Sequence, residues 1–268
     1  MKVREALAAA AARLAAVSDT PRLDAELLMA DALGVEREAM LLAGADVPAP
    51  AAFDALMARR MTREPVAYIL GRRAFWTIEL EVGPGALVPR PDSEALIEAA
   101  VVRFGDAGPA RILDLGTGPG TLLLAALDQW PSATGLGIDS SAAALDYARR
   151  NGNARAEFRR GDWGEGIAER FDLILCNPPY VEEGADLPAD VADFEPGAAL
   201  YAGADGLAAY RALAPQLARL LAPGGIVCLE IGAGQDAAVG ALMAAAGFTT
   251  QSRRDLGGNI RCLVLSLD

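Results

Sequence analysis

Four consecutive residues, Asn177-Pro178-Pro179-Tyr180, follow an apolar run at 171–176 and have side chains suited to binding a planar –NH2 group. Such a group has two N–H donors, and each needs an acceptor in a pocket that excludes water. The Asn177 side-chain oxygen and the Pro178 carbonyl can accept one each. Prolines lack an N–H and fix the shape of the loop, and the Tyr180 ring can stack on the planar group. The motif predicts a site for an amide or aminobase nitrogen.

A glycine-rich turn, Gly116-Thr117-Gly118-Pro119-Gly120, follows a second apolar run at 112–115. Glycine lets the backbone approach a ligand closely and adopt positive φ, and the helix expected next offers free N–H groups. Alone, the segment also fits an ordinary strand-to-helix turn. A dinucleotide-binding turn has the spacing G-x-G-x-x-G, whereas here the third glycine comes one position earlier. The spacing Asp-x-Gly-x-Gly-x-Gly from Asp114 is instead typical of methyltransferases that use S-adenosylmethionine.

Three further residues are candidates for binding the nucleoside of that cofactor. Asp139 ends the next expected strand, where a carboxylate can accept hydrogen bonds from both ribose hydroxyls; the alternative is a cap on the following helix. Asp162 and Trp163 follow the third strand, where they can bind the adenine amino group and cover the adenine ring, although Trp163 also fits a core position. The predicted cofactor site comprises Gly116, Thr117, Gly118, Pro119, Gly120, Asp139, Asp162, Trp163 and Asn177.

The two motifs together predict methyl transfer from S-adenosylmethionine to a nitrogen, with Asn177, Pro178, Pro179 and Tyr180 as catalytic residues. The protein would contribute positioning and a water-poor pocket. A strong base is not needed early, because the proton becomes acidic only as the N–C bond forms. The chain has no histidine, the usual general base and commonest metal ligand, so we expect no metal. Lys2 is the only lysine in the sequence, so neither Schiff-base chemistry nor a phosphate-loop lysine is expected at this site.

Strands and helices alternate from residue 110 onward. Strands are expected near 111–115, 134–138, 156–160, 171–176, 225–231, 248–253 and 261–267, and helices near 119–129, 141–150, 206–221 and 235–246. This alternation predicts an α/β fold with a mostly parallel sheet covered by helices on both faces.

The N-terminal part of the chain has a helical pattern throughout. Thr20-Pro21 predicts an N-cap followed by proline at the first helical position, with the helix ending at Gly34. Another helix is expected over 51–62. Residues 75–88 alternate and then reach Gly83-Pro84-Gly85, which predicts a β-hairpin that turns at those glycines. We interpret the helical part as serving partner recognition, or stability alone.

Composition restricts the partners and the location. The formal charge of −12 disfavours a nucleic-acid surface, because Lys and Arg supply most non-specific affinity, and it favours a protein partner. No apolar stretch approaches the roughly 20 residues of a membrane span. Cys176, Cys228 and Cys262 lie in apolar runs without a C-x-x-C pair, which indicates buried, reduced thiols in a cytoplasmic protein. We expect a monomer that binds neither nucleic acid nor membrane.

Over nearly its whole length the chain resembles the release factor glutamine methyltransferases, the PrmC or HemK family. The resemblance lies in the two motifs and in segments on both sides of them. These segments are Glu64–Gly71, Phe75-Trp76, Val88–Glu94, Phe194-Glu195-Pro196, Ala199-Leu200, Gly203–Leu207, Tyr210-Arg211, Pro223-Gly224-Gly225, Leu229–Gly232, Asp255-Leu256 and Arg261.

The resemblance implies methylation of the glutamine side-chain amide in the Gly-Gly-Gln motif of peptide-chain release factors, with S-adenosylmethionine as the cofactor. It implies a small all-α N-terminal domain over 1–73, joined by a β-hairpin linker over 74–90 to a Rossmann-like class I methyltransferase domain over 91–268. It also implies that residues 116–120, Asp139, Trp163 and Asn177 contact the cofactor, while residues 177–180 hold the glutamine.

Other functions fit part of the sequence. A close paralogue that methylates a ribosomal-protein glutamine would share the motifs. A DNA adenine methyltransferase would use Asn-Pro-Pro-Tyr on a flipped base but usually has a basic recognition domain, which the acidic charge and the absence of a recognition insert disfavour. A non-catalytic cofactor-binding sensor would have an eroded acceptor motif, and this motif is intact. The glycine spacing disfavours a nicotinamide oxidoreductase.

Overall fold

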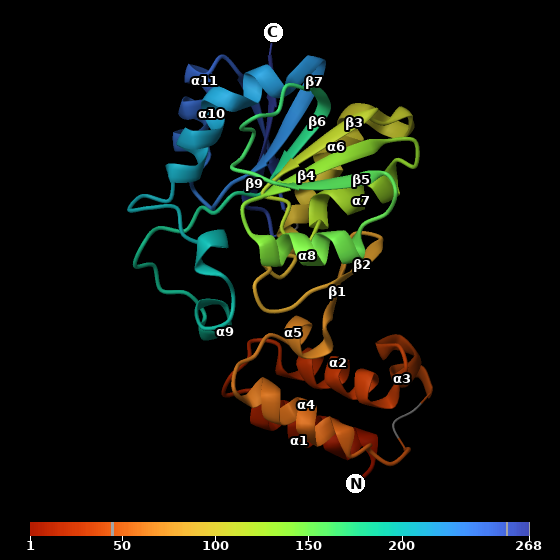
Figure 1. Cartoon of the computed structure of the whole chain (residues 1–268). Coiled ribbons are helices and arrows are strands. Elements are labelled where there is room, and N and C mark those ends of the chain that lie inside the picture. The colour runs from red at the N-terminus through yellow and green to blue at the C-terminus, as the bar shows by residue number, and fades with distance from the viewer. Residues whose placement is uncertain (44–45, 256, 268) are drawn as a thin grey trace. The chain divides into compact units, whose positions relative to one another are not determined.

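A computed structural model describes residues 1–43, 46–255 and 257–267 of the chain. The chain divides into two compact units (Figure 1): the first comprises Met1–Arg72 and Leu187–Phe194, and the second comprises Arg73–Asp186 and Glu195–Asp268. The domain limits drawn from the sequence do not include this return of residues 187–194 to the first unit. Within the described ranges, no helix is long and apolar enough to cross a bilayer.

The first unit is built from short helices around an apolar core. Leu7, Leu28, Met29 and Met57 are among the fully buried side chains of that core. The helices are α1 (Val3–Leu14), α2 (Pro21–Leu33), α3 (Arg37–Ala43), α4 (Ala52–Met61), α5 (Val66–Leu70) and α9 (Ala189–Ala192).

A buried ion pair links the helices of the first unit. Arg60 Nε donates to Asp24 Oδ2 at 2.7 Å, and Arg60 Nη2 lies 3.7 Å from Asp190 Oδ2 in α9. Helix α2 begins after Thr20 and ends at Gly34, as predicted, and Gly34 adopts the left-handed conformation. However, the Thr20 hydroxyl donates to Asp24 Oδ1 at 2.9 Å instead of accepting a helix N–H. The helix start is confirmed, but it lacks the expected side-chain cap.

The second unit contains a seven-stranded sheet in the order β5-β4-β3-β6-β7-β9-β8. Strand β9 is antiparallel to β7 and β8, and the other pairs are parallel, so the predicted mostly parallel sheet is confirmed. The strands are β3 (Arg111–Leu115), β4 (Thr134–Asp139), β5 (Ala156–Arg160), β6 (Phe171–Cys176), β7 (Leu221–Glu230), β8 (Thr249–Arg254) and β9 (Ile260–Ser266).

Helices cover the sheet on both faces. Figure 1 shows α6 and α7 on one face and α10 and α11 on the other. The longer helices are α6 (Glu94–Phe104), α7 (Thr121–Gln129), α8 (Ala142–Asn151), α10 (Ala208–Leu220) and α11 (Asp236–Ala245), and the 3-10 turns are η1 (Pro91–Ser93), η2 (Gly105–Ala107) and η3 (Gly197–Ala199). Because both faces are covered, the central strands are mostly apolar. The three cysteines are buried and unpaired, as expected.

A hairpin of β1 (Arg72–Phe75) and β2 (Ile78–Glu81) forms a separate two-stranded sheet. The predicted turn at Gly83-Pro84-Gly85 is present, with the Ala86 N–H donating to the Gly83 carbonyl at 3.1 Å, but it follows the hairpin, and the hairpin itself reverses at Trp76, between the two strands. Trp76 adopts a φ of 54°, and Glu94 Oε1 accepts its N–H at 2.9 Å. Gly83 also allows close packing, since a Cβ there would lie 2.3 Å from the Tyr147 hydroxyl. The tertiary contact with Glu94 selects a turn that local sequence does not favour.

The strand order places a switch point between β3 and β6. The chain moves outward from β3 to β4 and β5, and then returns to β6 on the other side of β3. In open α/β sheets, ligands bind at such a point, beyond the carboxyl ends of the strands. Leu115 and Cys176 pair at the ends of β3 and β6, so the glycine turn and the Asn-Pro-Pro-Tyr motif leave the sheet side by side.

Candidate active site

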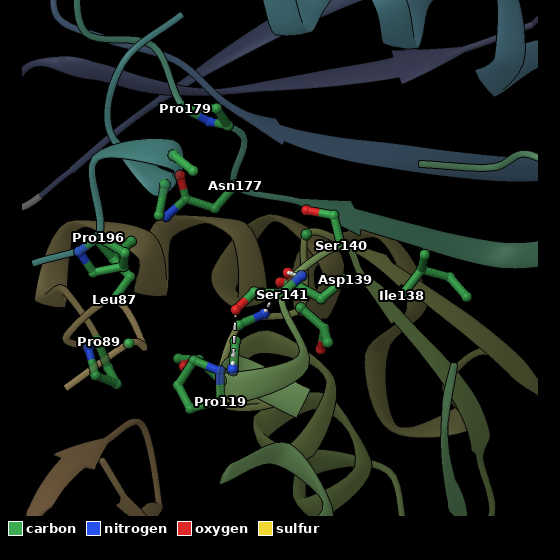
Figure 2. A pocket seen from close by; sticks show the side chains of 18 of the residues that line it. Leu87, Pro89, Pro119, Ile138, Asp139, Ser140, Ser141, Asn177, Pro179 and Pro196 are labelled. Carbon is green, nitrogen blue, oxygen red and sulfur yellow. Dashed lines mark hydrogen bonds between the residues drawn. The ribbon is translucent and has the colours of Figure 1, made fainter. Parts of the chain in front are cut away.

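A cavity of about 330 Å³ lies at the carboxyl ends of β3, β4, β5 and β6. Figure 2 shows Asn177 and Pro179 on one side of this cavity and Pro119 and Ser141 on another. Its walls come from the glycine turn, the ends of β4 and β5, the loop after β6, the segment before α6 and the segment around η3. Its volume lies in the range of roughly 300–1,000 Å³ that is usual for small-molecule sites.

Nine of the twelve predicted site residues line the cavity, and three do not. The nine are Gly116, Thr117, Gly118, Pro119, Asp139, Asp162, Trp163, Asn177 and Pro179. Gly120 instead begins α7 with a φ of 90°, and a Cβ there would lie 2.9 Å from Leu124. Pro178 is buried and is not among the lining residues, and the hydroxyl of Tyr180 donates to Glu230 Oε1.

The glycine turn bends tightly over the end of β4. Gly116 and Gly118 have φ values of 75° and 57°, a region in which residues with a Cβ are strained. The N–H groups of Gly116 and Thr117 both donate to the Ile138 carbonyl at 2.9 Å. A Cβ at Gly118 would meet nothing within 4 Å, so this glycine borders open space and leaves room for a ligand to lie against the backbone.

Asp139 organises two backbone segments and still has acceptor capacity. Its Oδ2 accepts the Gly118 N–H, and its Oδ1 accepts the Ser141 N–H, both at 2.8 Å. The cap of α8 is Ser141, whose hydroxyl accepts from Ala144 N at 3.2 Å. Because each carboxylate oxygen has about two acceptor sites, Asp139 can accept two further hydrogen bonds at the cavity wall. The alternative role of Asp139 as the helix cap is therefore wrong.

The buried carboxyl of Asp114 holds the glycine turn through hydrogen bonds. Asp114 has no exposed surface, and its Oδ2 accepts from the Thr117 hydroxyl at 2.7 Å and from Leu123 N at 3.2 Å. Its Oδ1 has no hydrogen-bond partner in the described part of the chain. Burial raises the pKa of Asp114 to about 7, while the hydrogen bond from Thr117 lowers it. In the sequence, Asp114 stands out only as the first residue of the Asp-x-Gly-x-Gly-x-Gly pattern.

The Asn177 carboxamide is held by a residue that the sequence did not single out. Asn177 Nδ2 donates to Ser93 Oγ at 3.0 Å, and Ser93, the last residue of η1, is only 2% exposed. With the –NH2 end engaged, the Oδ1 atom of Asn177 remains as the acceptor for a ligand. Ser93 lies within a segment that the sequence marks only by resemblance, so its contact with Asn177 could not be found from spacing.

Tyr180 is held by hydrogen bonds at both its side chain and its backbone. Its hydroxyl donates to Glu230 Oε1 at 3.3 Å, and its carbonyl accepts from Gln235 Nε2 at 3.1 Å. Burial, reinforced by the charge of Glu230, raises the pKa of Tyr180 to about 12. The phenol is therefore neutral, and the chain immediately after Pro179 is fixed against the sheet.

A second anchor joins two walls of the cavity. Glu195, which is buried, forms an ion pair with Arg90 at 2.5 Å and accepts the Val88 N–H at 3.1 Å. Pro196 follows Glu195 and lines the cavity together with Val88 and Arg90. The pair thereby ties the segment before α6 to the segment around η3. In the sequence, Glu195 and Arg90 were visible only as parts of the family resemblance.

Two family models match the chain. The PrmC N-terminal domain matches residues 5–71, and a methyltransferase domain matches residues 108–246. A Rhodospirillum rubrum protein named release factor glutamine methyltransferase is 46% identical over 92% of this chain and 79% of its own length. A Cereibacter sphaeroides protein of the same name is 43% identical over 97% of both chains. The chain belongs to the release factor glutamine methyltransferase family.

Solved structures agree on the fold of this family member. A methyltransferase from Pyrococcus furiosus has a TM-score of 0.55 at 19% identity, covering 79% of this chain and 98% of its own. The Thermus thermophilus 16S rRNA N2 G1207 methyltransferase, solved with AdoMet and guanosine, has a TM-score of 0.52 at 23% identity, covering 74% and 50%. The predicted class I methyltransferase fold and enzyme class are confirmed, and the nicotinamide oxidoreductase alternative is not supported.

Proposed function

We propose that this chain transfers a methyl group from S-adenosylmethionine to the side-chain amide nitrogen of the Gly-Gly-Gln glutamine in peptide-chain release factors. One observation supports this most strongly: Asn177 and Asp139 line the same cavity. Methyl transfer requires the donor and the acceptor to meet in one water-poor space, and these two residues belong to the predicted acceptor and cofactor motifs.

The cofactor side of the cavity fits a nucleoside. Asp139 has two acceptor positions left for ribose hydroxyls, and Gly118 leaves its wall free of side chain. Asp162 and Trp163 line the cavity where the adenine amino group and ring would lie. When bound, S-adenosylmethionine supplies an electrophilic methyl group, so that an N–C bond forms as the C–S bond breaks and the nitrogen then loses a proton to water.

The acceptor side satisfies the two N–H groups of a glutamine amide. Asn177 Oδ1 would accept one of them, because its Nδ2 is engaged by Ser93. The Pro178 carbonyl would accept the other, because it joins Pro178 to Pro179, which lines the cavity. With both N–H groups held, the nitrogen lone pair is directed toward the methyl carbon. Pro179 keeps the wall free of a competing donor. Positioning of this kind, without a base, is the main contribution of the protein.

The partner of this reaction is a protein. The acidic net charge of −12 disfavours nucleic acid, and the first unit contains the segment that matches the PrmC N-terminal domain. We propose that this helical unit recognises the body of the release factor while the glutamine enters the cavity. The protein would act as a cytoplasmic monomer, without direct binding of nucleic acid or membrane.

Mass analysis tests this proposal directly. Recombinant release factors, ribosomal proteins and duplex DNA are each incubated with the full chain and isotopically labelled S-adenosylmethionine. A single methyl group on the Gly-Gly-Gln glutamine, with no label on the other acceptors, is the expected result. Labelling of a ribosomal-protein glutamine alone, or of DNA adenine alone, would replace the proposed substrate with that acceptor.

A further inference from the structure

We propose that Gln216 and Arg219, on helix α10, are positioning residues that hold Trp163 in place against the cofactor. This inference rests on the proposed function, in which the Trp163 ring covers the adenine of S-adenosylmethionine. The two residues lie outside both sequence motifs and are not among those that line the cavity. They act through the loop that follows β5, because each of them bonds to the backbone of that loop.

Trp163 has an unfavourable backbone conformation at the wall of the cavity. Its φ is 48°, a region in which bulky side chains are strained. Trp163 is the second residue of a tight turn that begins at Asp162, whose carbonyl accepts the Glu165 N–H at 3.1 Å. The ring lies against the glycine turn, since a Cβ at Gly116 would be 3.4 Å from Trp163 Cζ3. Such a conformation persists only where the surrounding structure enforces it.

Helix α10 enforces this conformation through Gly164, the residue directly after Trp163. Gln216 Oε1 accepts the Gly164 N–H at 3.1 Å, and Arg219 Nη2 donates to the Gly164 carbonyl. The peptide groups on both sides of Gly164 are therefore fixed. Gly164 also packs directly on the helix, because a Cβ there would lie 2.5 Å from Leu220 Cδ1. The three α10 residues are spaced three and four apart, so they lie on one face of the helix.

The Arg219 guanidinium extends this support to the end of the loop. Its Nη1 donates to the Ile167 carbonyl at 2.6 Å, so one side chain engages two carbonyls of the loop. Arginine suits this role because its donors form a planar fork, whereas lysine has a single charged nitrogen. Ile167 is buried in the apolar core of the second unit. The loop is therefore held between α10 and the core, with Asp162 and Trp163 at the cavity.

This support should affect cofactor binding and leave the chemical step unchanged. Without the hydrogen bonds from α10, the backbone of Trp163 can relax out of positive φ, and the ring then leaves the position that covers the adenine. Binding must restore that position, and the ordering cost lowers cofactor affinity. The acceptor is held by Asn177, at the end of a different strand. Turnover at saturating cofactor should therefore not depend on Gln216 or Arg219.

The test measures the Kd for S-adenosylmethionine by titration calorimetry in variants of the full chain. Gln216→Leu, which lacks an acceptor, and Arg219→Lys, which lacks the fork, should each raise the Kd by roughly 3- to 12-fold, the equivalent of one hydrogen bond. Gln216→Glu keeps an acceptor for the Gly164 N–H and should stay within about twofold of the wild type. With intact release factor and saturating cofactor, kcat should change by less than about twofold in all three variants.

Two controls make the same changes away from the cavity. Arg103 Nη2 donates to the Gly224 carbonyl at 2.7 Å, so Arg103→Lys also replaces an arginine that is bonded to the backbone. Gln251→Leu repeats the glutamine change at an exposed position of β8. Neither Arg103 nor Gln251 lines the cavity, and both variants should bind the cofactor like the wild type.

A double-mutant comparison shows whether the effect passes through the Trp163 ring. Trp163→Ala alone should raise the Kd by roughly 5- to 150-fold, the range for a base stacked on an aromatic side chain. In that background Gln216→Leu should cost less than about twofold, because no ring is left to position. An equal cost in both backgrounds, or wild-type affinity of the folded Gln216→Leu and Arg219→Lys variants, would overturn the inference.

The titrations also separate this inference from the proposed substrate. Because no acceptor is present, raised Kd values would support the positioning role even if release factor were not methylated, which would refute the substrate alone. A wild-type chain that does not bind S-adenosylmethionine would refute the cofactor assignment and this inference together. If chemical denaturation shows that Gln216→Leu does not fold, Arg219→Lys, which keeps the charge and most of the side chain, decides.

Discussion

Replacing Asp139 by alanine should separate cofactor binding from folding. The proposed ribose contact consists of hydrogen bonds to a charged acceptor, worth roughly 1.5–3 kcal/mol. S-adenosylmethionine affinity should therefore fall by about 10- to 150-fold. The same carboxylate also accepts from Gly118 N and Ser141 N at 2.8 Å. Losing both acceptors should lower the free energy of unfolding by roughly 1–3 kcal/mol, at about 0.5–1.5 kcal/mol for each neutral donor.

Asp172 provides a matched control for the folding part of this effect. Its Oδ2 accepts the N–H groups of Ala110 and Arg111 at 3.0 and 2.9 Å. These bonds lie at the start of β3, the opposite end of the strand from the cavity. Asp172→Ala should lower the free energy of unfolding by a similar amount, because it also removes an acceptor of two backbone hydrogen bonds. Its cofactor affinity should stay within about twofold of the wild type.

Two measurements decide between the roles of Asp139. Titration calorimetry gives the Kd for S-adenosylmethionine, and chemical denaturation without ligand gives the free energy of unfolding. If Asp139→Ala loses stability as Asp172→Ala does but keeps wild-type affinity, then Asp139 only organises the turn and the ribose assignment is wrong. Asp139→Asn, which keeps one acceptor oxygen and the size of the side chain, should fall between alanine and wild type in affinity.

Three further predictions concern the acceptor, the substrate and pH. Asn177→Ala should lower turnover by at least about a hundredfold in a folded protein, through an unmatched amide donor and lost alignment; near-normal single-turnover rates would refute the clamp. Intact release factor should be methylated far more efficiently than a Gly-Gly-Gln peptide, which bears its full ordering cost; equal kcat/KM values would exclude recognition by the helical unit. The raised pKa values of Asp114 and Glu230, both about 7, mean that folding favours the protonated forms. Their contribution to stability is therefore lost as pH rises from the unfolded-state pKa of about 4 through the folded-state value of about 7, and Asp114→Asn should flatten the decline in the free energy of unfolding over this range; an unchanged slope would contradict this.

The sequence predicted features that depend on short stretches of chain. Strand β6 is apolar and buried except at Asp172, and the observed limits Phe171–Cys176 equal the predicted ones. Helix α2 begins at Pro21 and ends before Gly34 as predicted, because proline and glycine act on the backbone within a few residues. The glycine turn was also found from local spacing alone, since its conformation depends on residues within one turn.

The hairpin shows where local signals fail. Gly-Pro-Gly is a strong turn signal and does form a turn, but that turn lies after the hairpin, where Gly83 also permits close packing on Tyr147. The reversal occurs at Trp76, whose positive φ no local rule predicts. The N–H of Trp76 donates to Glu94, eighteen positions later in the chain. A turn fixed by such a tertiary hydrogen bond cannot be located from the sequence around it.

The acceptor site is subject to the same limit for a chemical reason. Asn177 could be assigned from its motif, because the chemistry needs a carboxamide after a strand. A carboxamide is useful only in one of two orientations, and the residue that holds its –NH2 end, Ser93, is distant in sequence and only 2% exposed. A buried serine has no spacing signature of its own. A substitution there would be classed as a core change, yet on this structure it removes the acceptor of the Asn177 –NH2 group.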